Sequence, residues 1–176
     1  MKENFKRLLL DTCIYGEMII DEDIERLKEK CHIKKSLAIY GLFLIRKELR
    51  ATSKTKSYMG RKLRLDLLSL YDGVVKERIL NIEERKVRAV AKKYYEAYRQ
   101  FGGNHTEREV LADFFIVACA ALKRMDLVVS NDHATLLSDS SIKAYSLVNT
   151  TLQLHHPDFI DYKKFKAFLL QEYGGD

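Results

Sequence analysis

Short apolar runs recur along the chain, and they predict the strands of a sheet. Each run is nearly continuous and does not alternate between apolar and polar residues, which is typical of strands covered on both faces. The predicted strands cover residues 7–10, 36–40, 126–130 and 142–148.

The segments between these runs have apolar residues at helical spacing. The clearest helix face carries apolar side chains at positions 87, 90, 91, 94, 98 and 101. Gly102 and Gly103 end this helix, and Thr106 with Glu109 predicts a capping box that begins the next one. The predicted helical segments cover residues 11 to about 30, 42–50, 53–101, 106 to about 124, and 158–173.

Strands that alternate with helices predict an α/β fold, in which a mainly parallel sheet carries helices on both faces. The length of 176 residues suits one domain, and no linker or repeat divides the chain. We therefore predict a single domain over residues 1–176, with about residues 150–176 as a C-terminal helical extension. In open parallel sheets, sites form just beyond the carboxyl ends of the strands.

The composition is that of a globular protein, with 47% hydrophobic and 32% charged residues. The apolar runs are far shorter than the ~20 residues of a membrane span, and the N-terminus lacks the apolar core of a signal peptide, so no membrane partner is expected. Three scattered cysteines without a metal-binding spacing indicate reduced thiols and a cytoplasmic location. The formal net charge of +6 favours an anionic partner, with nucleic acid first.

Four carboxylates stand out because of their apolar surroundings. Asp11 ends the first apolar run, and Asp132 follows the third. Asp113 is the one charged residue in the apolar segment 110–122, where an aspartate is costly without a partner, a proton or a metal. Glu48 lies on the short helix after the second strand. The predicted fold directs all four toward the same edge of the sheet.

Each carboxylate also has a simpler interpretation. Asp11 could cap the following helix, Asp132 could be a turn residue, Glu48 a solvated helix charge, and Asp113 half of a buried ion pair. If all four converge, however, their charges repel strongly unless divalent cations neutralise them. Oxygen-only ligand sets suit Mg²⁺ or Mn²⁺, which activate water and stabilise the leaving oxygen of a phosphodiester.

The chain resembles the PIN-domain family (PilT N-terminal-like), which includes the VapC-type toxin ribonucleases. The matching segments are "LLLDTCIY", "LFLIRKELR" and "ADFFIVACAALKRMDLVVSNDHATL", in that order, within about residues 6–150. The resemblance implies a three-layer α/β/α sandwich, here with expanded middle helices, and metal-dependent cleavage of RNA.

The same resemblance assigns roles to individual residues and implies partners. It makes Asp11, Glu48, Asp113 and Asp132 the acidic metal site, and it points to Ser130 as the polar residue that assists ahead of the last aspartate. It also implies a homodimer and an antitoxin protein as partners. Cys13 stands where serine or asparagine is common in the family, so we expect a weakened hydrogen bond near Asp11.

A basic segment without acids follows Glu48 and is predicted to contact RNA, with solvated helix surface as the alternative. Its cations are Lys54, Lys56, Arg61, Lys62 and Arg64. The leading hypothesis is thus a Mg²⁺- or Mn²⁺-dependent ribonuclease, either a toxin or an RNA-processing enzyme. A catalytically silent RNA-binding or assembly module is the alternative. A haloacid dehalogenase-like phosphatase would need a second aspartate where this chain has Cys13.

Overall fold

A parallel sheet lies at the centre of the computed structural model, which describes residues 5–171. Its strands are β1 (Lys6–Leu10), β2 (Leu37–Tyr40), β5 (Leu127–Val129) and β6 (Asp158–Ile160). They lie in the order β2-β1-β5-β6, and every neighbouring pair is parallel. Leu10, the last residue of β1, pairs with Val129, the last residue of β5. The residues that follow these two central strands therefore emerge side by side.

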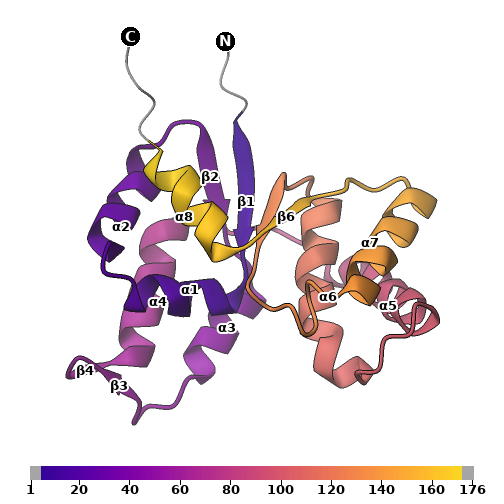
Figure 1. Ribbon diagram of the computed structural model, residues 1–176, viewed down its shortest axis with the longest axis horizontal. Helices are drawn as coiled ribbons and strands as arrows, with labels where there is room; N and C mark the ends of the chain where they lie inside the picture. Colours follow the sequence, from indigo (N-terminus) through magenta and orange to yellow (C-terminus); the bar gives the residue numbers. More distant parts are fainter. Residues whose placement is uncertain (1–4, 172–176) are drawn as a thin grey trace.

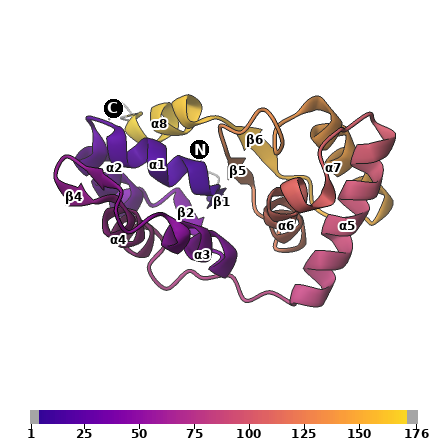
Figure 2. The same ribbon diagram turned by 90° about the horizontal axis from the view of Figure 1, so that it is seen from below.

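Helices cover both faces of the sheet, so the molecule has three layers, as predicted for an α/β/α sandwich (Figures 1 and 2). One layer holds α1 (Thr12–Ile20), α2 (Ile24–Ile33), α3 (Phe43–Ala51), α4 (Leu63–Val75) and α8 (Tyr162–Leu170). The other holds α5 (Glu84–Gln100), α6 (Glu107–Leu122) and α7 (Asp139–Thr151). No helix within residues 5–171 is long and apolar enough to cross a membrane.

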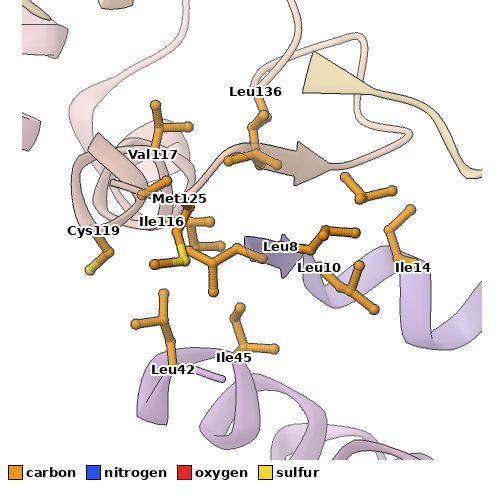
Figure 3. Packing of buried hydrophobic residues seen from close by; sticks show 14 of the residues in the cluster. Leu8, Leu10, Ile14, Leu42, Ile45, Ile116, Val117, Cys119, Met125 and Leu136 are labelled. Carbon is orange, nitrogen blue, oxygen red and sulfur yellow. The ribbon is translucent and has the colours of Figure 1, made fainter. Parts of the chain in front are cut away.

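The core lies on both sides of β1, whose last three leucines are fully buried. Figure 3 shows side chains from several elements in one cluster, among them Leu8 of β1, Ile14 of α1, Ile45 of α3 and Ile116 of α6. The continuous apolar run of β1 is therefore explained by helices that pack against both of its faces.

The predicted strand at residues 142–148 is wrong, because these residues lie inside α7. Ser138 caps the N-terminus of this helix, because its side chain accepts a hydrogen bond from the backbone N–H of Ser141. Its buried side chains recur at helical spacing, at positions 141, 144, 145, 148 and 149. The β-branched residues near both ends of this segment suggested a strand, but the spacing of the buried positions is that of a helix.

The fourth strand is instead β6, at residues 158–160, where the sequence predicted the start of a helix. β6 pairs with β5 along its whole length, so the segment expected as a helical extension begins with a strand of the sheet. Helix α8 follows, and Asp161 caps it by accepting a 2.7 Å hydrogen bond from the N–H of Lys164. The predicted helix end near residue 173 lies outside the described residues.

The predicted helical segment 53–101 is interrupted twice. First, β3 (Ser57–Tyr58) and β4 (Arg61–Lys62) form a hairpin, whose turn residues Met59 and Gly60 have φ angles of 48° and 77°. Second, α4 ends at Val75 and α5 begins only at Glu84. Short two-residue turns leave little trace in an apolar pattern, so the sequence did not reveal the hairpin.

The first predicted helix, residues 11 to about 30, divides into α1 and α2 at Asp21–Asp23. The Asp21 carboxylate accepts a 2.8 Å hydrogen bond from the N–H of Asp23, which stabilises a local turn. It also accepts hydrogen bonds from Tyr162 (2.8 Å) and Lys166 (2.7 Å) of α8. This turn therefore connects the N-terminal helices to the last helix.

Gly41 lets the chain pass from β2 into α3. A Cβ atom at this position would lie 2.3 Å from the hydroxyl oxygen of Tyr71 and 2.6 Å from a methyl carbon of Val75. That same hydroxyl donates a 2.9 Å hydrogen bond to the carbonyl oxygen of Leu42. The absence of a side chain at Gly41 thus allows α4 to pack closely where α3 begins, and this positions the helix that carries Glu48.

Candidate functional site

Asp11 and Ser130 are brought together by the parallel pairing of β1 and β5. The N–H of Asp11 donates to the carbonyl oxygen of Val129 (2.9 Å), and the hydroxyl of Ser130 donates to Asp11 Oδ2 (2.7 Å). Asp11 is 6% exposed and Ser130 is fully buried. Asp11 also caps α1, because its Oδ1 accepts a 2.6 Å hydrogen bond from the N–H of Thr12. The capping interpretation is thus correct for one carboxylate oxygen, while the other contacts Ser130.

The sulfur atom of Cys13 faces the same carboxylate. It lies 3.2 Å from Asp11 Oδ2 and 3.7 Å from the hydroxyl oxygen of Ser130. Burial of the thiol, together with the negative charge of Asp11, raises the pKa of Cys13 to about 12. The thiol therefore stays protonated and donates to Asp11. A thiol is a weaker donor than a hydroxyl, which is the physical basis of the weakened hydrogen bond expected at this position.

Glu48 extends from α3 toward the start of α1. It is half-buried, and the hydroxyl of Thr12 donates a hydrogen bond to its Oε2 atom. Burial raises the pKa of Glu48, and the negative charge of Asp11 raises it further, although the hydrogen bond from Thr12 acts in the opposite direction. Glu48 is therefore not a freely solvated helix charge, because it is coupled to the first strand end.

Asp113 has the most perturbed carboxyl group of the four. It lies on α6, which begins with the predicted capping box: the Glu109 carboxylate accepts a 2.7 Å hydrogen bond from the N–H of Thr106. Burial raises the pKa of Asp113 to about 7, and the charges of Asp11, Asp132 and Glu48 add to the rise, while a hydrogen bond from Thr135 lowers it in part. The pKa of Asp113 on α6 thus responds to one carboxylate on α3 and to two others that follow the ends of β1 and β5.

The ion-pair interpretation of Asp113 has no support in the described part of the chain. No lysine, arginine or histidine within residues 5–171 forms a salt bridge with it. Its hydrogen-bond donor is the hydroxyl of Thr135, at 2.5 Å. A buried carboxylate with no cationic partner favours protonation or a bound cation.

Asp132 is both a turn residue and a member of this group. Its Oδ1 accepts hydrogen bonds from the N–H groups of Ala134 and Thr135, each 3.0 Å long, and its Oδ2 accepts one from the hydroxyl of Thr135. Burial alone would raise the pKa of Asp132, but these hydrogen bonds outweigh it and lower the pKa below its usual value. Asp132 is therefore ionised near neutral pH, whereas Asp113 is the member that holds a proton most easily.

Each of the four carboxylates contacts one of three hydroxyl groups. Ser130 contacts Asp11 and also accepts the N–H of Asp132 at 3.0 Å. The hydroxyl of Thr135 lies within hydrogen-bond distance of both Asp132 and Asp113 and, having one proton, donates to one of them at a time, and Thr12 donates to Glu48. We did not predict roles for the two threonines. Their positions, one residue after Asp11 and three after Asp132, were the signal available in the sequence, since threonine hydroxyls often contact nearby polar groups.

Within residues 5–171, no three acidic, histidine or cysteine side chains are gathered closely enough to hold a metal ion as they stand. The carboxylate oxygens that an ion would use are hydrogen-bonded to threonine and serine hydroxyls. The carboxylates and hydroxyls fit Mg²⁺ or Mn²⁺, and the neighbouring thiol of Cys13 is a poor ligand for either ion because it stays protonated. An ion would have to replace some of these hydrogen bonds.

The predicted RNA-contacting cations lie on and around the β3–β4 hairpin, which extends from one end of the molecule (Figure 1). Lys54, Lys56, Arg61 and Lys62 are exposed, and Arg64 is half-buried at the start of α4. Arg61 lies 3.5 Å from Asp66. A cavity of about 580 Å³ lies between this hairpin and α1, α2 and α4, but neither the four carboxylates nor Ser130 line it. We therefore place the candidate chemistry at the strand ends and not in this cavity.

Comparison of the sequence with protein-family models and with curated proteins finds no match. Comparison with solved structures finds a chain of FitAB, which was determined bound to an IR36 DNA fragment. The two chains have 16% sequence identity and a TM-score of 0.55, and the alignment covers 96% of this chain and 99% of the other. At this identity the likeness is one of fold. The fold is PIN-like, as the resemblance predicted.

Proposed function

We propose that this protein is a divalent-metal-dependent ribonuclease that hydrolyses phosphodiester bonds at the edge of the sheet near Asp11, Glu48, Asp113 and Asp132. The observation that carries the proposal is Asp113, because burial and the charges of the other three acids raise its pKa to about 7. A group of acids with this mutual repulsion is unfavourable for stability alone, so a cationic ligand is the simplest reason for it.

The ion would be Mg²⁺ or Mn²⁺, held by Asp11, Glu48, Asp113 and Asp132. A bound divalent ion would supply an activated water and charge stabilisation at the leaving oxygen. Ser130 orients Asp11 through its hydrogen bond, and Thr135 holds Asp113 and Asp132 toward each other. With its raised pKa, Asp113 can release a proton near neutral pH when a cation approaches.

The positive charge of the protein supports RNA as the substrate. The exposed lysines and arginines of the hairpin segment lie in the same layer as Glu48, and the chain has a formal net charge of +6. Cations of this kind bind phosphates in a manner that does not depend on base sequence.

The biological role we propose is that of a cytoplasmic toxin or an RNA-processing nuclease. The PIN-like fold is shared with FitAB, a toxin–antitoxin complex, and this supports an antitoxin protein as a partner. A homodimer is proposed from the family resemblance alone.

The test is incubation of labelled RNA with the purified protein and Mn²⁺, with and without EDTA. We expect cleavage that EDTA abolishes and that falls at least 100-fold in Asp113→Asn. Glu96→Gln, which changes an exposed acid on α5, is the matched control and should cleave as the wild type does. Equal background in wild type and Asp113→Asn, together with RNA binding, would favour the catalytically silent RNA-binding module instead.

A further inference from the structure

The solvent-facing side of α3 carries an aromatic ring beside two cations. Phe43 is 75% exposed, which is unusual for a large apolar side chain. Lys47 and Arg50 follow at the fourth and seventh positions and are exposed as well. This spacing places all three side chains on one helix face.

The remaining residues of α3 have other contacts. Ile45 and Leu49 are buried on the opposite face, so the orientation of the helix is fixed. Arg46, between the two faces, makes two hydrogen bonds of 2.8 Å with Asp72. Lys47 and Arg50, by contrast, form no ion pair with any residue of the described chain.

Helix α3 begins at the edge of the sheet where Asp11 lies. β2 ends at Tyr40, which pairs with Leu9 of β1, and Phe43 begins the helix three residues later. Asp11 follows Leu9 by two residues, so the start of α3 and Asp11 lie at the same edge of the sheet. Glu48 on this helix is hydrogen-bonded to Thr12, next to Asp11. The helix that carries the exposed face therefore also carries one carboxylate of the candidate site.

Positive charge continues from this face along the chain. Beyond the end of α3 at Ala51, the exposed residues Lys54, Lys56 and Lys62 lead into the hairpin, and none of them forms an ion pair within residues 5–171. Cations without ion-pair partners thus extend along the chain from the exposed ring of Phe43. A single-stranded nucleic acid alternates bases with phosphates, so the ring can stack on a base while the cations bind the phosphates.

We propose that the face formed by Phe43, Lys47 and Arg50 is a binding subsite for an unpaired nucleotide of a single-stranded RNA. The base stacks on the ring of Phe43, and Lys47 and Arg50 hold the adjacent phosphates. This inference rests on the proposed function and adds to it: the substrate is single-stranded where it leaves the carboxylates. Paired bases hide their faces inside a duplex, so a duplex cannot use the ring in this way.

The sequence contains no tryptophan, which makes a direct test feasible. Phe43→Trp introduces one indole at the proposed stacking position, and Phe101→Trp introduces one at an exposed phenylalanine at the end of α5, in the other helical layer. Each variant is titrated in EDTA, so that no cleavage occurs, with oligouridylate, oligodeoxythymidylate and a 12-base-pair RNA duplex. We expect oligouridylate to quench the fluorescence of Phe43→Trp, with the duplex and the Phe101→Trp variant showing no quenching.

Binding strength and salt dependence give a second readout by fluorescence anisotropy of labelled oligouridylate. Loss of one stacked base in Phe43→Ala should weaken binding about 5- to 100-fold. The double variant Lys47→Ala/Arg50→Ala should lower the slope of log K against log[salt] by about 1.4, because each phosphate contact to a single strand contributes about 0.7. The control Lys92→Ala/Lys143→Ala removes two exposed cations from α5 and α7 and should leave the slope unchanged.

The outcomes separate this inference from the proposed function. Oligouridylate that binds without quenching Phe43→Trp, or quenching by the duplex to the same extent, overturns the stacking subsite and leaves the nuclease proposal standing. Stronger quenching by oligodeoxythymidylate than by oligouridylate overturns RNA as the occupant. Quenching by oligouridylate in a protein that cleaves no RNA with Mn²⁺ supports the subsite and contradicts the nuclease.

Discussion

The hydroxyl of Ser130 donates a 2.7 Å hydrogen bond to Asp11, a residue 119 positions earlier in the chain. Each of the two residues directly follows a central strand, and the parallel register of β1 and β5 places them side by side. The same hydroxyl oxygen accepts the N–H of Asp132 at 3.0 Å. One buried hydroxyl thus holds two of the acidic positions in place.

Ser130→Ala should destabilise the protein by about 1–3 kcal/mol, because it leaves a buried carboxylate oxygen and a backbone N–H without their partner. The measurement is urea unfolding followed by circular dichroism. Ser36→Ala is the matched control: Ser36 is also buried, and its hydroxyl has no hydrogen-bond partner within the described residues. That variant should be neutral or slightly stabilising, and equal losses in both variants would contradict a specific role for Ser130.

Asp113→Asn should make the metal-free protein more stable than the wild type at pH 8 but not at pH 5. The folded state raises the pKa of Asp113 to about 7, above its unfolded value, so it favours the protonated carboxyl. The associated stability is present below about pH 4 and is lost as the pH rises through about 7. The difference at pH 8 is at most about 4 kcal/mol, since one pKa unit corresponds to about 1.4 kcal/mol.

The measurement for Asp113 is thermal unfolding in EDTA at several pH values. Asparagine keeps an acceptor for the hydroxyl of Thr135, so the hydrogen bond of the wild type is retained in the variant. A large loss of stability in Asp113→Asn at pH 8 would show that the carboxylate makes a stabilising ion pair. Asp139→Asn, at an exposed position, should show no pH-dependent difference from the wild type.

The sequence was informative where burial is nearly complete. The last three residues of β1 are leucines because helices pack against both faces of the strand, and Asp113 was recognisable because it is isolated in an apolar helix segment. Each of these features depends on the local pattern alone. The three-layer arrangement and the convergence of Asp11 with Asp132 then follow from the general rule for parallel sheets.

Features that depend on tertiary contacts were not predictable in the same way. β6 has three residues and is recognisable as a strand only by its pairing with β5, and α7 contains residues that favour strands in isolation. In the sequence, nothing distinguishes Thr12 and Thr135 from ordinary helix and turn residues. Their contacts with Glu48 and Asp113 arise only when the chain folds. Tertiary packing of this kind outweighs the intrinsic helix or strand propensity of individual residues.

Millimolar Mn²⁺ should raise the melting temperature of the wild type by about 2–10 °C. An ion that binds only the folded state stabilises it by mass action, and it also relieves the repulsion among the carboxylates. For a chain of this length, 1 kcal/mol corresponds to about 2–4 °C. The shift should be much smaller in Asp113→Asn and unchanged in Glu96→Gln, as measured by differential scanning calorimetry. A wild-type protein whose melting temperature does not respond to Mn²⁺ would contradict a shared metal site.

Cys13 should react slowly with iodoacetamide at pH 8, although the residue has an exposed surface. Burial of the thiol and the charge of Asp11 raise its pKa to about 12, so the thiolate that reacts is scarce. We expect alkylation at least 100-fold slower than in guanidinium chloride, where all three cysteines should be modified. Because Asp11→Asn removes the negative charge, it should accelerate the reaction at Cys13 but leave the buried Cys119 unaffected, which peptide mass spectrometry can distinguish. Fast modification of Cys13 in the wild type would mean that its sulfur does not face the carboxylate of Asp11.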